Sequence, residues 1–210
     1  VAMMYRSAGM PEFAIGALQQ LASRHTENLE ARIMLYEIMR ESAREDDARK
    51  QAESTFALFP DEPSAQLNLA RAYRDAGEIE LAQEVLKRGS QDGAGPVELT
   101  LALADLLLYD GKTDEAAAFL EKVKDTDRSK TEIVILSGFI AAARGDWNGV
   151  REIGKAAAGP SYPLPLRLLY VAALLETGEM EAAAEPLRGG GGEPLAGPST
   201  NVLLRTLGVE

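Results

Sequence analysis

Cysteine is absent from the 210-residue sequence, and histidine and tryptophan occur once each. Without cysteine the chain forms no disulfide and offers no thiolate, and a single histidine is too few for the usual structural zinc sites. Aromatic residues make up only 6% of the sequence, and alanine and leucine dominate its apolar residues, a composition that favours helices over strands. No apolar run reaches the roughly 18 residues of a membrane-spanning helix, so we expect no span in this sequence.

The charged residues are unbalanced towards the acidic side. Lysine and arginine together number 22, aspartate and glutamate 33, and the formal net charge is −11. Because a nucleic-acid partner requires a basic face for its phosphates, this balance argues against one. The negative charge favours solubility or a basic or neutral partner, and solubility alone is the simpler explanation.

A pattern of small residues recurs along the chain at an interval of 34 residues, with a last step of 33. One position of each copy is glycine or alanine: Gly9, Ala43, Gly77, Gly111, Gly145 and Gly178. Five positions later comes a second small or short apolar residue: Ala14, Ala48, Ala82, Ala116, Val150 and Ala183. Seven positions before each residue of the first set (Gly9 and its counterparts) comes a third residue of the pattern, which is usually small: Ala2, Tyr36, Ala70, Ala104, Gly138 and Val171. The residue directly before it is usually apolar.

This pattern predicts a row of helical hairpins. A glycine in the left-handed conformation ends the first helix at little energetic cost. An acidic residue such as Glu78 after Gly77 suits the start of the second helix. The small residue of the second helix lets the two helices approach closely. A single hairpin leaves an apolar face uncovered, so neighbouring hairpins must stack to bury it.

The interval and its companion residues resemble the tetratricopeptide repeat (TPR), a 34-residue hairpin with the pattern W-x2-L-G-x2-Y, then A-x3-F, A and P. The copy "LARAYRDAGEIELAQEVL" matches best at the family's places: Leu69, Ala70, Tyr73, Gly77, Ala82 and Leu86. The tryptophan place departs from the pattern and holds other residues: Arg32, Gln66, Thr100, Val134 and Arg167. The resemblance implies an all-α fold, a right-handed superhelical solenoid of about five to six hairpins with a short C-terminal helix.

We expect the repeat array to cover residues 1–190. Its units are expected at residues 1–28 (partial), 29–62, 63–96, 97–130, 131–163 and 164–190. Residues 189–198 are expected to form a Gly/Pro-rich loop, because four consecutive glycines do not pack as a helix. Residues 199–210 are expected to form a terminal helix that either caps the stack or begins a further unit. The first unit starts inside its first helix, which suggests a fragment and leaves an upstream signal or lipid anchor open.

No pattern of residues predicts catalysis. His25 is expected at a helix end, where a cation is favoured. The acidic run of Glu45, Asp46 and Asp47 suits a helix start among arginines better than a cation site. The glycines at 189–192 lack the lysine of a phosphate-binding loop. We therefore expect no catalytic residue, no cofactor and no metal.

The expected partner-binding residues follow from the resemblance. In TPR proteins the first helices line a concave inner wall, along which partners usually lie, and here that wall includes Arg71, Arg74, Leu108, Tyr109, Ile135, Phe139, Leu168 and Leu175. Arg71 and Arg74, three apart on one helical face, can grip one carboxylate. The plainer alternative is that they pair with acidic residues of the same wall: Glu37, Glu41 or Asp105. The six apolar residues either form a groove for a partner's helix or extended segment, or are covered within the chain.

We interpret the sequence as a non-catalytic protein–protein interaction scaffold that binds a partner peptide or helix on the concave surface of a TPR superhelix. The Ala-, Gly- and Glu-rich composition looks bacterial, and long TPR arrays of this kind occur in bacterial envelope and exopolysaccharide-export proteins. The compartment, cytoplasm or periplasm, stays open. Two alternatives remain. One is an interaction module of a larger enzyme or regulator, and the other is a structural scaffold that self-associates as a homo-oligomer.

Overall fold

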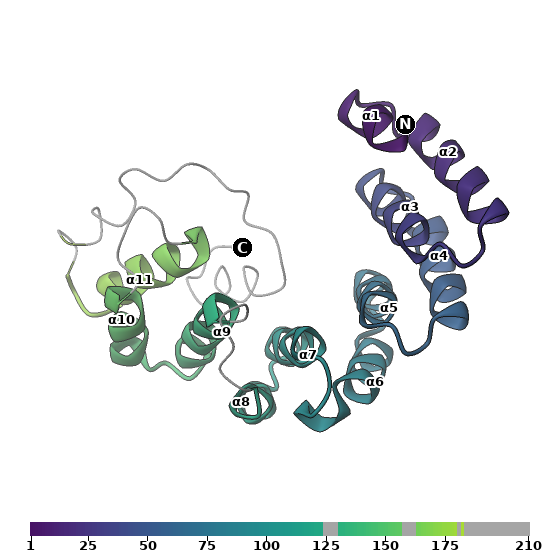
Figure 1. Cartoon of the computed structure of the whole chain (residues 1–210). Helices are drawn as coiled ribbons and strands as arrows, with labels where there is room; N and C mark the ends of the chain where they lie inside the picture. The colour runs from purple at the N-terminus through teal and green to yellow at the C-terminus, as the bar shows by residue number, and fades with distance from the viewer. Residues whose placement is uncertain (124–129, 157–162, 180–181, 183–210) are drawn as a thin grey trace. The chain divides into compact units, whose positions relative to one another are not determined.

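The protein is all-α throughout the part of the chain that the computed structural model describes, which comprises residues 1–123, 130–156, 163–179 and 182. These residues form eleven α-helices and one short 3-10 helix, and no strand occurs among them (Figure 1). The predicted all-α fold is therefore confirmed. The chain divides into two compact units, Val1–Gln91 (unit 1) and Asp92–Glu210 (unit 2).

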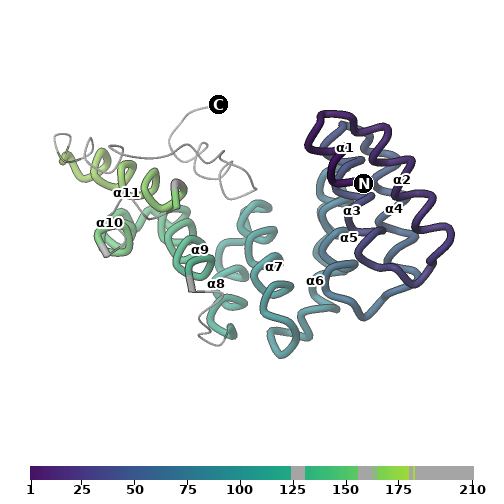
Figure 2. The backbone as a smooth tube through the Cα atoms, turned by 45° about the horizontal axis from the view of Figure 1, so that its top comes forward, coloured from purple at the N-terminus to yellow at the C-terminus, as the bar shows by residue number. Residues whose placement is uncertain are grey.

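Unit 1 consists of three helical hairpins that follow one another along the chain (Figure 2). Their helices are α1 (Ala2–Ser7), α2 (Pro11–Arg24), α3 (Leu29–Glu41), α4 (Glu45–Leu58), α5 (Pro63–Asp75) and α6 (Ile79–Ser90). Each helix packs against the next, and the first helices of consecutive hairpins, α3 and α5, also contact each other. These contacts stack the hairpins in a row, which is how a repeat too small to have its own core is stabilised.

Unit 2 repeats this arrangement. The short helix η1 (Gln91–Gly93) spans the division between the units and is followed by α7 (Val97–Tyr109), α8 (Thr113–Glu121), α9 (Lys130–Ala143), α10 (Trp147–Ala156) and α11 (Leu164–Glu176). Here too the first helices pack in sequence, α7 with α9 and α9 with α11. The second helix expected after α11, the expected loop at 189–198 and the expected terminal helix at 199–210 lie outside the described residues.

All six turn positions of the repeat have the left-handed backbone that the pattern predicts. The five glycines have φ between +70° and +82°, and Ala43 has φ +55°. In α5 the Gly77 N–H donates to the Arg74 carbonyl (2.9 Å) and the Glu78 N–H donates to the Tyr73 carbonyl (2.8 Å). This bond pair is the Schellman motif, and it recurs at every turn of the series. Ala43 carries a Cβ, so the same conformation costs it roughly 1–2 kcal/mol.

The small residue of the second helix is buried in every described hairpin. Ala14, Ala82 and Ala116 have no exposed surface, and Ala48 and Val150 are 3% and 1% exposed. A longer side chain at these positions would push the two helices of a hairpin apart, because protein interiors are close-packed. The predicted series of small contact residues is therefore confirmed as far as Val150, and Ala183 lies outside the described residues.

Ion pairs of one kind link two of the turns to the preceding hairpin. Arg49 of α4 pairs with Glu78 of the next turn (2.8 Å), and Arg151 of α10 pairs with Glu179 in the corresponding place of unit 2 (2.6 Å). Each partner is about a third or more exposed, so a pair stabilises the fold by about 1 kcal/mol at most. Because the same ion pair recurs, the second helix of one hairpin and the turn of the next have the same relative position at both places.

Candidate functional site

The six apolar residues predicted on the inner wall of unit 2 differ widely in exposure. Leu108 and Phe139 are 2% and 1% exposed, whereas Leu175 is 46% exposed. The remaining three are half-buried: Tyr109, Ile135 and Leu168. A groove formed by all six would need Leu108 and Phe139 at the surface. Their burial favours the alternative in which part of this set is covered within the chain, and it leaves Leu175 as the most accessible of the six.

The two arginines predicted on the inner wall of unit 1 have different environments. Arg71 is exposed, whereas the Arg74 guanidinium donates to the Asp75 carboxylate at 2.6 Å. Glu41, one of the acidic partners expected for these arginines, instead pairs with Arg6 of α1. Arg74 thus carries a local partner on its own helix, and Arg71 is the more available of the two for a carboxylate from outside.

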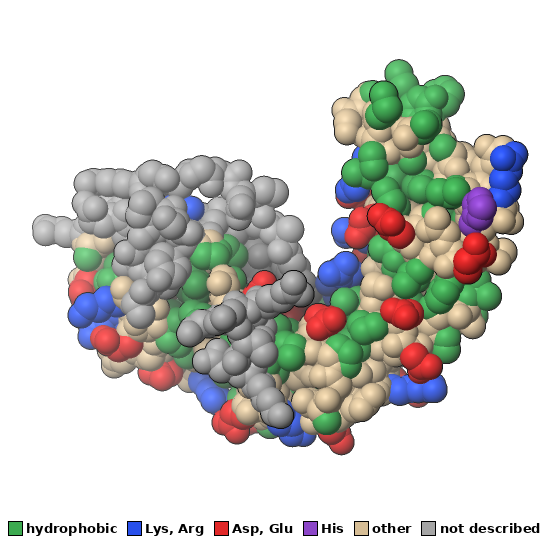
Figure 3. Space-filling view, in the orientation of Figure 1, with side chains coloured by type: hydrophobic (Ala, Val, Ile, Leu, Met, Phe, Trp, Pro, Cys, Tyr) green, Lys and Arg blue, Asp and Glu red, His purple; other side chains and the backbone are tan. Residues whose placement is uncertain are grey.

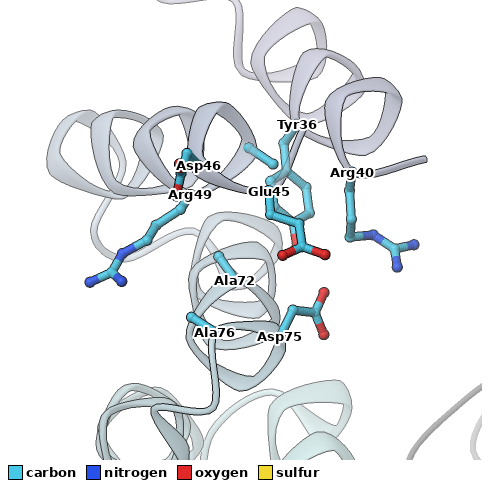
Figure 4. A pocket seen from close by; sticks show the side chains of 9 residues that line it. Tyr36, Arg40, Glu45, Asp46, Arg49, Ala72, Asp75 and Ala76 are labelled. Carbon is cyan, nitrogen blue, oxygen red and sulfur yellow. The ribbon is translucent and has the colours of Figure 1, made fainter. Parts of the chain in front are cut away.

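A pocket of about 200 Å³ opens where α3, α4 and α5 meet (Figure 4). Nine residues line it: Tyr36, Arg40, Glu45, Asp46, Ala48, Arg49, Ala72, Asp75 and Ala76. In Figure 4 the Tyr36 ring extends from α3 towards the side chains of Glu45 and Asp75, while the Arg49 guanidinium points away from that ring. The pocket therefore brings a phenol and two carboxylates together from three different helices.

Tyr36 is the buried polar group of this pocket. It is 1% exposed, and its hydroxyl has no hydrogen-bond partner within the described structure. Burial raises the pKa of Tyr36 to about 12, the negative charge of Asp75 adds to the rise, and the positive charges of Arg40, Arg71 and Arg74 oppose it. The phenol is therefore neutral at ordinary pH. A buried hydroxyl without a partner costs about 1–3 kcal/mol, so a group that bonds to it gains an unusually favourable contact.

The site residues predicted from the sequence did not include Tyr36, although a signal was present. The neighbouring copies of the repeat have small residues at its place: Ala2, Ala70, Ala104 and Gly138. A tyrosine there must extend its ring beyond the helix contact that a small residue would make. The replacement of a small residue by a large one at a fixed repeat position is therefore a usable sign of a site.

His25 and the acidic run at residues 45–47 lie at the helix ends where the sequence predicts them. His25 follows α2 at its C-terminal end, with its Nδ1 3.7 Å from the Glu27 carboxylate. The acidic run begins α4, where Asp47 pairs with Arg44 at 2.7 Å. Within residues 1–123, 130–156 and 163–179, no group of three or more His, Cys, Asp or Glu side chains is placed to hold a metal ion. No helix in the same part of the chain has the length and apolar character needed to span a membrane.

No protein-family model and no curated protein matches the sequence, but solved structures do. A tetratricopeptide repeat protein from Parabacteroides merdae aligns with a TM-score of 0.72 at 13% identity, over 99% of this chain and 84% of that one. A thermophilic TPR protein from Thermus thermophilus aligns with a TM-score of 0.63 at 20% identity, over 83% and 95%. YrrB, a TPR protein with an unusual peptide-binding site, aligns with a TM-score of 0.53 at 12% identity, over 89% and 92%.

Identities this low indicate a common fold and leave the partner open. They agree with the stacked hairpins, the left-handed turns and the buried small residues of this chain. The protein is therefore an all-α helical solenoid with the fold of the tetratricopeptide repeat proteins, a fold that commonly mediates protein–protein interaction.

Proposed function

We propose that the chain is a non-catalytic scaffold that binds a peptide or helix of a protein partner along its first helices. One observation supports this most directly. Arg40 of α3 and Arg71 of α5 are exposed, and neither has an ion-pair partner among the described residues. Both are close enough to Tyr36 to influence its pKa, so their charges act on one region of unit 1. Arginine binds carboxylates through charge-assisted and often paired hydrogen bonds, which suits an acidic group of a partner.

In unit 2 the proposed contact is apolar and centres on Leu175, with Tyr109, Ile135 and Leu168 contributing through their partly exposed surfaces. Amphipathic partner helices bind such surfaces through a few apolar side chains at helical spacing. The likeness to YrrB supports peptide binding as a property that this fold can carry. A setting in a bacterial envelope assembly rests on the sequence resemblance alone.

Peptide selection followed by affinity measurement tests the proposal. Peptides are selected on the wild-type protein from a displayed library, and their affinities are then measured for Arg40→Ala/Arg71→Ala. We expect affinity to fall about tenfold or more, because each lost charged hydrogen bond is worth about 1.5–3 kcal/mol. Arg88→Ala, at an exposed arginine of α6, is the matched control and should bind normally. Selected peptides that bind the double variant as tightly as the wild type would contradict the proposal for unit 1.

A second candidate function, self-association, is favoured by an apolar patch on the first hairpin (Figure 3). Met3, Met4 and Phe13 are 49%, 74% and 63% exposed. The next hairpin has Glu37, Ile38 and Asp47 at the places of Met3, Met4 and Phe13, so the repeat itself does not call for apolar residues at the first and last of these places. Light scattering over a concentration series should show a growing mass that Met4→Ser/Phe13→Ser abolishes. A constant monomer mass for the wild type would exclude this role.

A further inference from the structure

The pocket around Tyr36 contains acceptor groups for which the chain supplies no donor. The phenol is almost fully buried and its hydroxyl is unpaired within the described part of the chain. Glu45 and Asp46 also line the pocket, and neither forms an ion pair with any described residue. Natural proteins rarely leave buried polar atoms unpaired, so such an atom in an open pocket points to a missing ligand.

The charges inside the pocket favour a cation. Asp75, which is paired with Arg74, acts on Tyr36 from α5, and the Glu45 side chain, unpaired among the described residues, lies beside the Tyr36 ring at the start of α4 (Figure 4). Arg49 lines the pocket as well, but its guanidinium donates to Glu53 (3.0 Å) and Glu78 (2.8 Å). The positive charges that act on the phenol are those of Arg40, which also lines the pocket, and of Arg71 and Arg74 on α5. Two of the pocket's acidic side chains, Glu45 and Asp46, are thus unpaired within the described part of the chain, and of its two arginines Arg49 is already neutralised by Glu53 and Glu78.

The size of the pocket decides between a metal ion and an organic cation. A volume of about 200 Å³ corresponds to roughly seven water molecules at about 30 Å³ each. A bare ion would leave most of this space to water, and the described part of unit 1 has no cluster of metal-ligating side chains. An alkylammonium or guanidinium group with its carbon chain fills the space and donates several hydrogen bonds at once.

From these observations we infer that the pocket binds the cationic end of a basic side chain, lysine or arginine, carried by the partner peptide. The cation donates to the Tyr36 hydroxyl oxygen and to the carboxylate of Glu45, and Asp75, which is paired with Arg74, adds negative charge beside them. A carboxylate next to that side chain in the partner then contacts Arg40 and Arg71. This inference rests on the proposed peptide-binding function and specifies the partner chemistry as a basic residue beside an acidic one.

The probe is a short acetylated and amidated alanine peptide with one central lysine, titrated into 15N-labelled protein and followed by NMR. The matched peptide has norleucine in place of lysine, and further peptides carry a central arginine or only a free α-amine. We expect the lysine and arginine peptides to shift the amide signals of the pocket-lining residues. The norleucine peptide should leave these signals in place. If the free-amine peptide binds saturably and the lysine and arginine peptides do not, the assignment to a side chain is wrong.

Two nearly isosteric variants test the roles of the pocket groups. Tyr36→Phe removes only the unpaired hydroxyl, and Glu45→Gln removes one charge, so each should keep the fold and weaken the lysine peptide about tenfold or more. Tyr73→Phe, a tyrosine of α5 outside this pocket, and Glu30→Gln, an exposed glutamate of α3, are the controls. Unchanged affinity in both pocket variants, with folding shown by melting, overturns the inference.

The two proposals fail in different ways. If Arg40→Ala/Arg71→Ala releases the selected peptides while the pocket variants do not, the proposed function stands and the basic-side-chain pocket is wrong. If the lysine peptide binds as expected while the arginine variants keep every selected peptide, the pocket stands and the arginine contact is wrong.

Discussion

The first helices of the two units carry different side chains at the same places of the repeat. Arg74 of unit 1 and Leu108 of unit 2 are one repeat apart; the Arg74 side chain is 25% exposed and Leu108 is 2% exposed. Arg71 and Phe139 are two repeats apart; Arg71 is exposed and Phe139 is 1% exposed. At these two positions of the repeat, unit 1 thus has arginines that reach solvent, and unit 2 has the buried apolar residues Leu108 and Phe139.

This contrast shows that the composition of a first helix decides whether the residues predicted on the inner wall lie at the surface or in the core. In α7, Leu106, Leu107 and Leu108 are all buried. At 3.6 residues per turn, three consecutive positions cover more than half of the circumference of a helix. In α5, by contrast, Arg71 is exposed between the buried Ala70 and Ala72. A partner is therefore expected to meet charge in unit 1 and a few apolar side chains in unit 2.

The largest effect is expected from substitutions that test whether the residues predicted on the inner wall of unit 2 are buried. Phe139→Ala should lower the free energy of unfolding by about 3–5 kcal/mol, because it removes a buried aromatic side chain and leaves a cavity. Leu175→Ala should lower it by less than about 1 kcal/mol, since nearly half of Leu175 already faces solvent. Urea unfolding measures both values. Equal losses for the two variants would mean that Phe139 is as accessible as Leu175 and would break the contrast.

The next effect concerns how closely helices approach in each unit. In α10, a Cβ on Gly154 would lie 2.5 Å from the Cβ of Tyr170, so Gly154→Ala forces α10 and α11 apart at a cost of about 2–3 kcal/mol. In α2, a Cβ on Gly16 meets no atom within 4 Å, so Gly16→Ala should stabilise by about 0.5–1 kcal/mol through helix propensity. Thermal unfolding gives both changes, and a stabilising Gly154→Ala would refute the close contact.

A third effect is the pH dependence of folding stability that the Tyr36 pocket of unit 1 should cause. Burial raises the pKa of Tyr36 from 10.0 to about 12, so the unfolded chain loses this proton at a lower pH than the folded chain does. The resulting stability is complete below pH 10, declines between pH 10 and 12, and amounts to roughly 3 kcal/mol, since one pKa unit corresponds to about 1.4 kcal/mol. Tyr36→Phe should lack this decline and should match or exceed the wild type below pH 10. Parallel stability curves for the two proteins up to pH 12 would show an exposed phenol.

The sequence predicts features that the repeat imposes on every copy and misses those that depend on a single copy. The positive φ at Gly77 and the burial of Ala82 follow from the 34-residue pattern, because each hairpin must close and pack in the same way. The burial of Phe139 does not follow, since the pattern places a residue on the inner wall and leaves open what covers that wall. The Tyr36 pocket depends on one departure from the pattern, together with charges from α4 and α5.

The smallest expected effect concerns the one described turn of the series that lacks glycine. Ala43 is left-handed at φ +55°, whereas the glycine turns of both units reach this region without a Cβ. Ala43→Gly should therefore stabilise unit 1 by about 0.5–1 kcal/mol, the relief of backbone strain being partly offset by the greater freedom of glycine in the unfolded chain. The converse change, Gly77→Ala, should destabilise by about 1 kcal/mol, although no atom lies within 4 Å of its added Cβ. If urea unfolding shows both variants to be neutral, steric strain does not make the Ala43 turn less stable than the glycine turns. The stability of the turns in both units would then depend mainly on the two hydrogen bonds of the Schellman motif.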